Sequence, residues 1–298
     1  MMFEGALTAM VTPFDDEGRV DEEGLRKNVE FQIKRGIHGL VPVGTTGECS
    51  TLSYDEHIRV VEAVVEAAKG RVPVLAGTGS NSTWEAIMLT KRAKDAGADG
   101  ALVVVPYYNR PTQAGLYAHF RKIAEEVDIP IVIYNIPSRT GVNILPETVA
   151  KLAKLKNIVG IKEASGDMEQ VRRIIEMVDR EDFIVTSGND SDTLEIMRLG
   201  GVGVISVASN IVPERVVELV EAARRGDWER AERIHSELLP LFKALFIETN
   251  PVPVKTAMRW MGMPAGGVRL PLVEMEPENQ RILRRVLVEM GLLAGGPE

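Results

Sequence analysis

Residues 130–162 read PIVIYNIPSRTGVNILPETVAKLAKLKNIVGIK and contain the pattern that predicts the fold of this chain. Two short apolar runs, PIVIYN and NIVGIK, flank a longer mixed segment. Each run is nearly continuous in Val and Ile, which is typical of parallel strands that are buried on both faces. The stretch is therefore predicted to form one strand–helix–strand unit.

The same pattern recurs along most of the chain. Six further apolar runs are LTAMVTP, GLVPVG, VPVLAG, GALVVVP, FIVTSG and GVGVISV, and segments with apolar residues at helical spacing lie between the runs. We place the ends of the eight predicted strands 18 to 33 residues apart, near Thr12, Gly44, Gly77, Pro106, Asn135, Lys162, Gly188 and Ser206. Eight such units predict an α/β fold of the (β/α)8 TIM barrel type.

A doubly wound open sheet is the alternative fold for such a pattern. It normally opens with a glycine-rich dinucleotide-binding turn. Here Gly77-Thr78-Gly79 is followed by Ser82 where that turn requires glycine, so the barrel is favoured.

The end of the chain is helical in pattern. A helix from about Pro213 to Arg225 is expected to complete a barrel domain of residues 1–225. Residues 226–298 are predicted to form a C-terminal helical domain that packs against the barrel, with a helical pattern from Trp228, an interruption at Pro251 and two further helices.

Composition and charge exclude several classes of protein. Asp and Glu number 43 and Lys and Arg 35, and the net charge of −8 argues against a nucleic acid or an anionic membrane as the main partner. The single cysteine, Cys49, has no second cysteine with which to form an intrachain disulfide. We find neither the pattern of a signal peptide nor an apolar run long enough to span a membrane. We therefore expect a cytoplasmic protein. The four histidines lie far apart, so no metal site is expected.

The functional site of such a barrel lies at the C-terminal ends of its strands. Lys162 ends one predicted strand, and burial would free its amine to form a Schiff base with a carbonyl compound. The alternative is an ordinary lysine paired with a carboxylate such as Glu163. Tyr134 ends the neighbouring strand, where its phenol either transfers protons near Lys162 or packs in the core.

Three loops at other strand ends add candidates. GTTGE (44–48) combines turn-forming glycines with two hydroxyls, which suit a carboxylate or a proton relay, or else only cap a helix. Arg139 is suited to bind a carboxylate, or is simply solvated. The adjacent Tyr107 and Tyr108 indicate an interface or a site role, or packing under their loop.

Two further patterns are weaker. Cys49 and His57 are considered as a nucleophile pair, but Cys49 follows a turn that does not have the form of a nucleophile elbow. Gly200, Gly201 and Gly203 could hold a phosphate, although tight chain packing is the preferred explanation.

Five motifs together resemble a known family, namely GTTGE, PYYNRP, YNIPSRTG, GIKEASG and ETNPVPVK. In this order, from about Phe3 to Leu293, the chain is similar to the dihydrodipicolinate synthase family of pyruvate-dependent lysine aldolases, which include N-acetylneuraminate lyase. The resemblance implies a (β/α)8 barrel with a C-terminal helical domain. It also implies a lyase of lysine and diaminopimelate biosynthesis that condenses pyruvate with L-aspartate 4-semialdehyde, with no cofactor.

The resemblance also implies roles for matching residues. Lys162 forms the Schiff base with pyruvate, and Tyr134, Thr45 and Tyr108 form a proton relay in which Tyr108 reaches across a dimer interface. The implied substrate-binding residues hold the two carboxylates or line the pocket: Thr46 for pyruvate, Arg139 for the semialdehyde, and Gly188 and Ile205 for the lining.

Two alternative functions stay open on the residues. A 2-keto-3-deoxy sugar-acid or N-acetylneuraminate aldolase shares the lysine and the tyrosine, but Ser138-Arg139-Thr140-Gly141 favours the synthase. A non-catalytic barrel that binds a keto acid is disfavoured by the intact set of Lys162, Tyr134 and Thr45.

The family resemblance further implies regulation and assembly. Some relatives are inhibited by L-lysine at the dimer interface, and the matching positions here are Cys49, Ser50, Tyr54, His57, Asn81, Glu85 and Tyr107. Tyr54 stands where lysine-sensitive relatives often have histidine. The family is usually a homotetramer built as a dimer of dimers, and we expect the same assembly.

Overall fold

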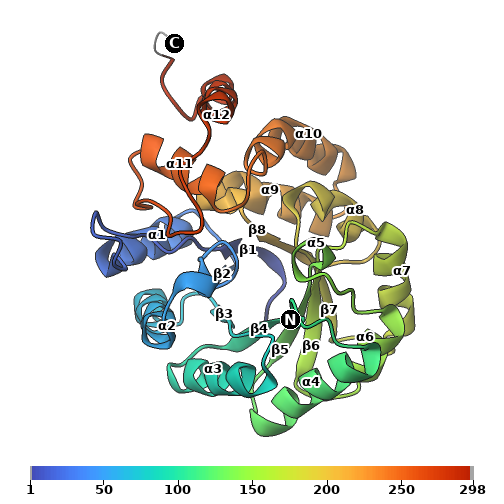
Figure 1. Ribbon diagram of the computed structural model, residues 1–298. Coiled ribbons are helices and arrows are strands. Elements are labelled where there is room, and N and C mark those ends of the chain that lie inside the picture. The colour runs from blue at the N-terminus through green and yellow to red at the C-terminus, as the bar shows by residue number, and fades with distance from the viewer. Residues whose placement is uncertain (1, 296–298) are drawn as a thin grey trace.

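Eight parallel strands form a ring at the centre of the molecule, with helices around it (Figure 1). The computed structural model describes residues 2–295. Around the ring the strand order is β2-β1-β8-β7-β6-β5-β4-β3, and an isolated parallel bridge between Leu40 and Val74 joins the two end strands. The predicted (β/α)8 barrel is therefore confirmed, and the doubly wound sheet is excluded.

The strands end within about three residues of the predicted positions. The eight strands are β1 (Gly5–Ala9), β2 (Gly39–Val41), β3 (Leu75–Gly77), β4 (Gly100–Val104), β5 (Ile131–Asn135), β6 (Ile158–Glu163), β7 (Ile184–Ser187) and β8 (Gly203–Ser206). Because all run in the same direction, their C-terminal ends meet at one mouth of the barrel.

Helices connect the strands and complete the chain. The α-helices are α1 (Glu22–Lys34), α2 (Tyr54–Ala68), α3 (Thr83–Asp95), α4 (Gln113–Glu126), α5 (Pro137–Thr140), α6 (Pro146–Leu152), α7 (Met168–Met177), α8 (Thr193–Arg198), α9 (Pro213–Arg224), α10 (Trp228–Ala244), α11 (Val252–Trp260) and α12 (Pro277–Glu289). Short 3-10 turns are η1 (Cys49–Thr51), η2 (Asp190–Asp192) and η3 (Ala208–Asn210).

Local sequence explains where many of these helices begin. A side-chain oxygen just before the first turn accepts a hydrogen bond from a backbone N–H that would otherwise lack a partner. Residues in this role are Asp21, Ser53, Ser82, Thr112, Asp167 and Asp227. At α2 the Glu56 side chain also accepts from the Ser53 N–H, which completes a capping box.

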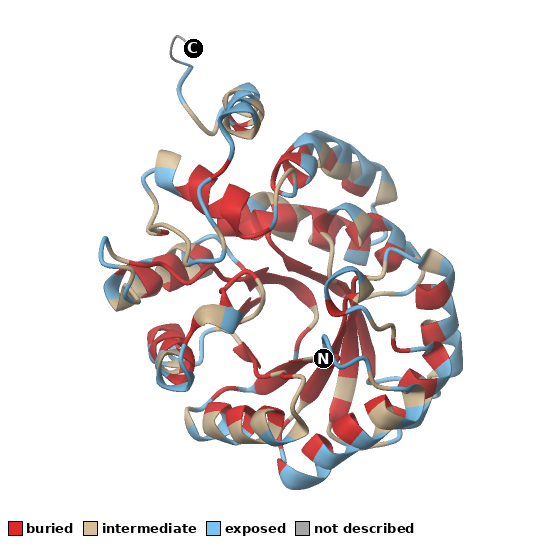
Figure 2. Ribbon diagram, viewed as in Figure 1, coloured by how far each residue is buried: buried red, intermediate tan, exposed pale blue. Residues whose placement is uncertain are grey.

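The core has two layers, one inside the barrel and one between the barrel and its helices (Figure 2). The inner cluster takes side chains from strands all around the ring, including Leu7, Val41, Leu102, Tyr134 and Ile205. The helices bury one face against the strands and expose the other, as their apolar spacing requires.

The C-terminal helices share the core of the barrel. Buried residues of α10, α11 and α12, such as Leu241, Val254 and Leu283, belong to the same apolar cluster as Leu25 and Val61 of the barrel helices. The expected packing of the tail against the barrel is therefore observed. The boundary at residue 225 stays a prediction, and residues 296–298 lie outside the described part of the chain.

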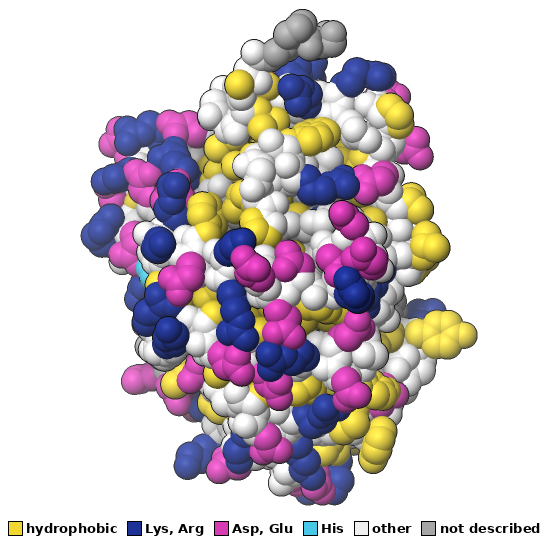
Figure 3. All heavy atoms as spheres, turned by 90° about the vertical axis from the view of Figure 1, so that its left-hand side faces the viewer, with side chains coloured by type: hydrophobic (Ala, Val, Ile, Leu, Met, Phe, Trp, Pro, Cys, Tyr) yellow, Lys and Arg dark blue, Asp and Glu magenta, His cyan; other side chains and the backbone are white. Residues whose placement is uncertain are grey.

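The outer surface mixes charges of both signs. Figure 3 shows Lys and Arg side chains interspersed with Asp and Glu over the face that includes α1 and α2. Cross-helix ion pairs such as Arg59–Glu22 and Arg26–Glu66 contribute to this pattern. None of the helices within residues 2–295 is long and apolar enough to cross a membrane.

Candidate active site

Lys162 and Tyr134 lie side by side inside the mouth of the barrel. They are opposite each other in the register of β5 and β6, as the neighbouring strand ends predicted. Lys162 is only 6% exposed, and its Nζ lies 4.0 Å from the centroid of the Tyr134 ring. A cationic Lys162 would interact favourably with this ring face, whereas a neutral amine would have its lone pair free for addition to a carbonyl.

Burial shifts the protonation of both groups. It lowers the pKa of Lys162 from 10.5 to about 7, and the Arg139 charge adds to this shift while the Asp190 carboxylate opposes it. Burial raises the pKa of Tyr134 to about 12, against the opposing effects of Arg139 and of a hydrogen bond with Thr45. At neutral pH the site therefore combines an available amine with a protonated phenol.

Glu163 is not the partner of Lys162. Its buried carboxylate accepts hydrogen bonds from the side chains of Asn135 and Gln170 and from the Ser165 N–H. Burial raises the pKa of Glu163, and these hydrogen bonds oppose the shift. The simple reading of Lys162 as one half of a strand-end ion pair with Glu163 was therefore wrong.

Gly188 directly follows β7 and Ile205 lies in β8, and their place in the lining of a substrate pocket stays a prediction. A Cβ atom on Gly188 would lie 3.1 Å from Cε of Lys162 and 2.7 Å from Cβ of Ala164, so a larger residue would press on the lysine. Ile205 in β8 is buried in the inner cluster that also contains Tyr134.

The GTTGE loop follows β2 and closes one side of the mouth. Thr45 reaches Tyr134 through the hydrogen bond named above. Thr46 is buried, and its Oγ1 accepts a hydrogen bond of 2.9 Å from Nδ2 of Asn250. Two hydroxyls of one loop therefore lie beside the phenol and the C-terminal segment.

Arg139 lies in α5, directly after β5. Its Nη2 donates to the Asn250 carbonyl at 3.2 Å. Its charge acts on the pKa values of both Lys162 and Tyr134. The guanidinium therefore supplies positive charge at the mouth of an acidic protein and retains donors for an anionic substrate.

Tyr108 lies at the surface, unlike the buried groups of this site. It is 88% exposed, has a φ of 73°, and is followed closely by Arg110 with a φ of 49°. Its neighbour Tyr107 is 39% exposed and lines the cavity described next. Within one chain, the expected relay of Tyr108 with Tyr134 and Thr45 is therefore not assembled.

A cavity of about 680 Å³ extends outward from the mouth. Its lining includes Thr45 and Arg139 together with most of the residues matched to an L-lysine site, namely Cys49, Ser50, Tyr54, His57, Glu85 and Tyr107. In it the Tyr54 hydroxyl and the Ser80 hydroxyl each donate to Glu85 at 2.6 Å. Asn81 is not part of the lining, and its carbonyl accepts from Nδ2 of Asn109.

Comparisons with known proteins agree with this geometry. The model of the dihydrodipicolinate synthetase family matches residues 2–290. The chain belongs to this family. The 4-hydroxy-tetrahydrodipicolinate synthase of Methanothrix thermoacetophila is 55% identical over 294 residues, which cover 99% of each chain.

Solved structures of the dihydrodipicolinate synthetase family have the same fold. The enzyme from Aquifex aeolicus is 52% identical, with a TM-score of 0.96 over 98% of this chain and 100% of its own. The chloride-inhibited enzyme from Acinetobacter baumannii, solved with pyruvate, is 44% identical, with a TM-score of 0.95 over 97% of this chain and 99% of its own. The predicted function of a 4-hydroxy-tetrahydrodipicolinate synthase, a lyase, is confirmed, and the sugar-acid aldolase and the non-catalytic barrel are not favoured.

Two other interpretations of the sequence lose support in this family member. Burial raises the pKa of the Cys49 thiol to about 11, and Nε2 of His57 is hydrogen-bonded to the Gly77 carbonyl at 2.7 Å, so they do not form an activated nucleophile pair. At Gly203 a Cβ would lie 1.9 Å from the Gly5 carbonyl oxygen, which explains this glycine by tight packing of β8 against β1.

Potential metal ligands are not clustered. Within residues 2–295, no group of three or more His, Cys, Asp or Glu side chains is arranged to hold a metal ion.

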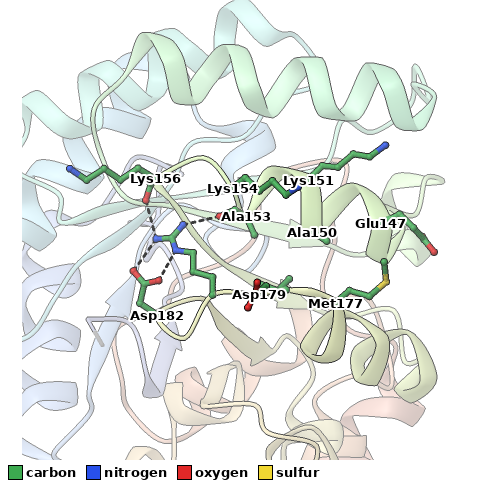
Figure 4. A pocket seen from close by; sticks show the side chains of 11 residues that line it. Glu147, Ala150, Lys151, Ala153, Lys154, Lys156, Met177, Asp179 and Asp182 are labelled. Atoms are coloured by element: carbon green, nitrogen blue, oxygen red, sulfur yellow. Dashed lines mark hydrogen bonds and ion pairs between the residues drawn. The ribbon is translucent and has the colours of Figure 1, made fainter.

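A second hollow lies at the opposite end of the barrel and is structural. Arg180 lines this hollow, and in Figure 4 the Lys151 and Lys156 side chains extend away from it. Nη1 of Arg180 donates to the carbonyls of Ala153, Leu155 and Ile158 at 2.9 to 3.1 Å, and Nε donates to Asp182. These contacts fix the chain as it enters β6, the strand that ends with Lys162 and Glu163.

Sequence reasoning missed two residues that touch this site. Asp190 is buried, accepts from the N–H groups of Val207 and Ala208 and acts electrostatically on Lys162. Asn250 contacts both Thr46 and Arg139, and the only signal for it was the ETNPVPVK motif, to which no role was assigned.

Proposed function

We propose that this chain condenses pyruvate with L-aspartate 4-semialdehyde through a Schiff base on Lys162, as a 4-hydroxy-tetrahydrodipicolinate synthase of lysine and diaminopimelate biosynthesis. The strongest support is the buried amine of Lys162, whose pKa is lowered to about 7 beside Tyr134. At pH 7 about half of such amines are neutral, against roughly one in 3,000 for an amine of ordinary pKa.

The proposed reaction balances without a metal or an organic cofactor. The Lys162 amine adds to the C2 carbonyl of pyruvate, and loss of water gives an imine, which is the electron sink. Loss of a methyl proton gives an enamine, whose carbon attacks the aldehyde carbon of the semialdehyde. The amino group of the semialdehyde part then displaces the lysine, which closes the ring and releases 4-hydroxy-tetrahydrodipicolinate.

The neighbouring groups have the chemistry that these steps need. Tyr134 and Thr45 are hydrogen-bonded to each other, which suits a relay of protons to and from the carbinolamine oxygen. Thr46 is proposed to bind the pyruvate carboxylate, and Arg139 the carboxylate of the semialdehyde. Gly188 leaves room beside the Lys162 stem.

Reduction with borohydride tests the central step. In the presence of pyruvate, we expect a stable reduced adduct on Lys162, located by peptide mass mapping. Lys162→Met is expected to give no adduct, while the exposed-lysine variant Lys154→Met keeps it. An adduct on another lysine, or none in the wild type, would overturn the mechanism.

Arg139→Ala separates the two substrates. Because Arg139 is assigned to the semialdehyde, its loss should raise the KM for the semialdehyde more than the pyruvate concentration needed for adduct formation. An equal loss of both would mean that Arg139 organises the whole mouth instead.

The exposed Tyr108 leads us to propose that a second copy of the chain completes the site. The side chains of Trp84 and Tyr107 are also exposed, and exposed aromatic side chains of this kind are suited to be covered by a partner in a dimer. The proposed assembly is a tetramer built as a dimer of dimers. Sizing by analytical ultracentrifugation tests the assembly, and a monomer with full activity would refute the role of Tyr108.

The cavity beside the mouth, which Glu85 and Tyr54 help to line, is the proposed place for inhibition by L-lysine. Glu85 and the hydroxyl of Tyr54 are suited to an amino acid, although each already has a partner in the other. Titration of L-lysine into the assay tests this proposal, and no effect at millimolar concentrations would remove it.

A further inference from the structure

The GTTGE loop has an unusual backbone that must be held in place. Val43, directly before the loop, and Glu48, its last residue, both have left-handed conformations, with φ of 52° and 54°. Such conformations are unfavourable for residues other than glycine, above all for a β-branched residue such as Val43. Such a conformation persists only where surrounding contacts fix it.

A buried ion pair at the end of the loop supplies such contacts. Nζ of Lys255, in α11, donates to Oε1 of Glu48 at 2.7 Å and to the Thr12 carbonyl at 2.9 Å. Both side chains are almost fully buried, with exposures of 1% for Lys255 and 2% for Glu48. The other carboxylate oxygen of Glu48 accepts from the Arg269 N–H at 3.0 Å.

The pair is also enclosed on its other sides. Lys255 Nζ lies 4.2 Å from the centre of the Phe14 ring, and the Arg269 guanidinium lies 4.4 Å from the same ring. Burial lowers the pKa of Lys255 to about 8, and Glu48 opposes this shift. Because its Nζ is hydrogen-bonded to Glu48 and Thr12 and packs over the Phe14 ring, Lys255 is not a second Schiff-base lysine but a fixed point for the loop.

The ion pair is continuous with the substrate-binding part of the loop. Only Gly47 separates Glu48 from Thr46, and the Thr12 hydroxyl donates to the Gly47 carbonyl at 2.7 Å. Asn250, five residues before Lys255, donates to Thr46 at 2.9 Å. The segment around α11 therefore holds the loop at both its hydroxyl and its carboxylate.

We propose that the Lys255–Glu48 ion pair is a positioning device, through which α11 sets the orientation of Thr45 and Thr46 and hence the affinity for the keto-acid carboxylate. This inference rests on the proposed function, because it assigns that carboxylate to Thr46. Neither Lys255 nor Glu48 is expected to touch substrate.

Variants of the Lys255–Glu48 ion pair can separate an effect on the position of the loop from an effect on the stability of the protein. Removing one partner leaves an unpaired buried charge, which is strongly destabilising, whereas replacing both with groups of similar shape is often close to neutral. We therefore expect Lys255→Met to lower the Tm, and the double variant Lys255→Met with Glu48→Gln to recover most of that loss.

Pyruvate binding should not recover in the double variant even though the Tm does. In the double variant we expect the half-saturating pyruvate concentration for borohydride trapping on Lys162 to stay raised by roughly tenfold or more, because a small misplacement of binding groups is costly. The KM for pyruvate should rise in parallel. Glu169→Gln, which disrupts an exposed ion pair with Arg172, is the matched control and should change neither value.

The positioning role and the Schiff-base function would be refuted by different results. Wild-type pyruvate dependence in a double variant of wild-type Tm would overturn the positioning role. If the double variant unfolds at the assay temperature, trapping of the double variant and of the wild type at a temperature below its Tm gives the same test. Absence of trapping in the wild type would instead refute the Schiff-base function itself.

Discussion

Replacing the active-site lysine should make the protein more stable at neutral pH. In Lys162→Met the side chain keeps its approximate length but no longer ionises. The pKa of Lys162 falls from 10.5 to about 7 on burial, so the folded state binds fewer protons than the unfolded state between these values. This difference corresponds to a cost of about 4–5 kcal/mol to the wild type at pH 7.

The pH dependence of this effect has a definite sign. As the pH rises from 7 towards 10.5, the Lys162 amine of the unfolded wild type loses its proton as well, and the free-energy cost of burying this amine disappears. The advantage of Lys162→Met should therefore be largest at pH 7 and below, and should shrink by about 1.4 kcal/mol for each pH unit above it. Any difference in packing between Met and Lys adds an offset that does not depend on pH.

Urea unfolding of both proteins at pH 7, 8 and 9 measures this slope. Circular dichroism at one fixed protein concentration is needed because association also adds to stability, and refolding from urea checks reversibility. Lys154→Met replaces an exposed lysine, which is hydrated in both states, and should show no slope. A difference that is flat or grows with pH would refute the argument that burial depresses the pKa of Lys162.

Three further outcomes are expected. Asp190 raises and Arg139 lowers the pKa of the Lys162 amine. In the pH profile of borohydride trapping, Asp190→Asn should therefore lower the apparent pKa and Arg139→Gln should raise it. Shifts of the opposite sign would contradict this assignment. Arg180→Ala should cost about 1–3 kcal/mol of stability in thermal unfolding, since four carbonyls lose their donor, whereas Arg172→Ala on the surface should cost less than about 1 kcal/mol. Tyr108→Phe should reduce kcat without changing the Tm, and full activity would exclude this hydroxyl from the relay.

The barrel was predictable because its strands are encoded locally. Runs such as PIVIYN and NIVGIK are apolar on both faces, and the segment between them has room for helical structure, which the chain forms as α5 and α6. Neighbouring strand ends then placed Tyr134 next to Lys162, as the register of β5 and β6 shows. The exact ends differed by up to about three residues because loops continue the apolar pattern beyond the hydrogen-bonded ladder.

The supporting residues were not predictable in this way. Asn250 meets Thr46 across 204 positions of sequence, and Lys255 meets Glu48 across 207, so no local pattern connects them. Lys255 looks like an ordinary helix lysine until the fold buries it. The proposed role of Tyr108 involves a second molecule, which one sequence does not describe.

The seam between β2 and β3, where the ring of strands closes, offers a way to measure whether the active site is occupied by a ligand. Leu40 and Val74 form a single bridge there, whereas β5 and β6 pair along their length. Amide hydrogens at such a weakly paired place exchange with deuterium through small local openings rather than global unfolding. Since Thr45 and Thr46 lie in the loop that follows β2, a keto acid bound there would restrain the end of that strand. Slower deuterium uptake at the seam, read by mass spectrometry, would then count filled sites without any turnover.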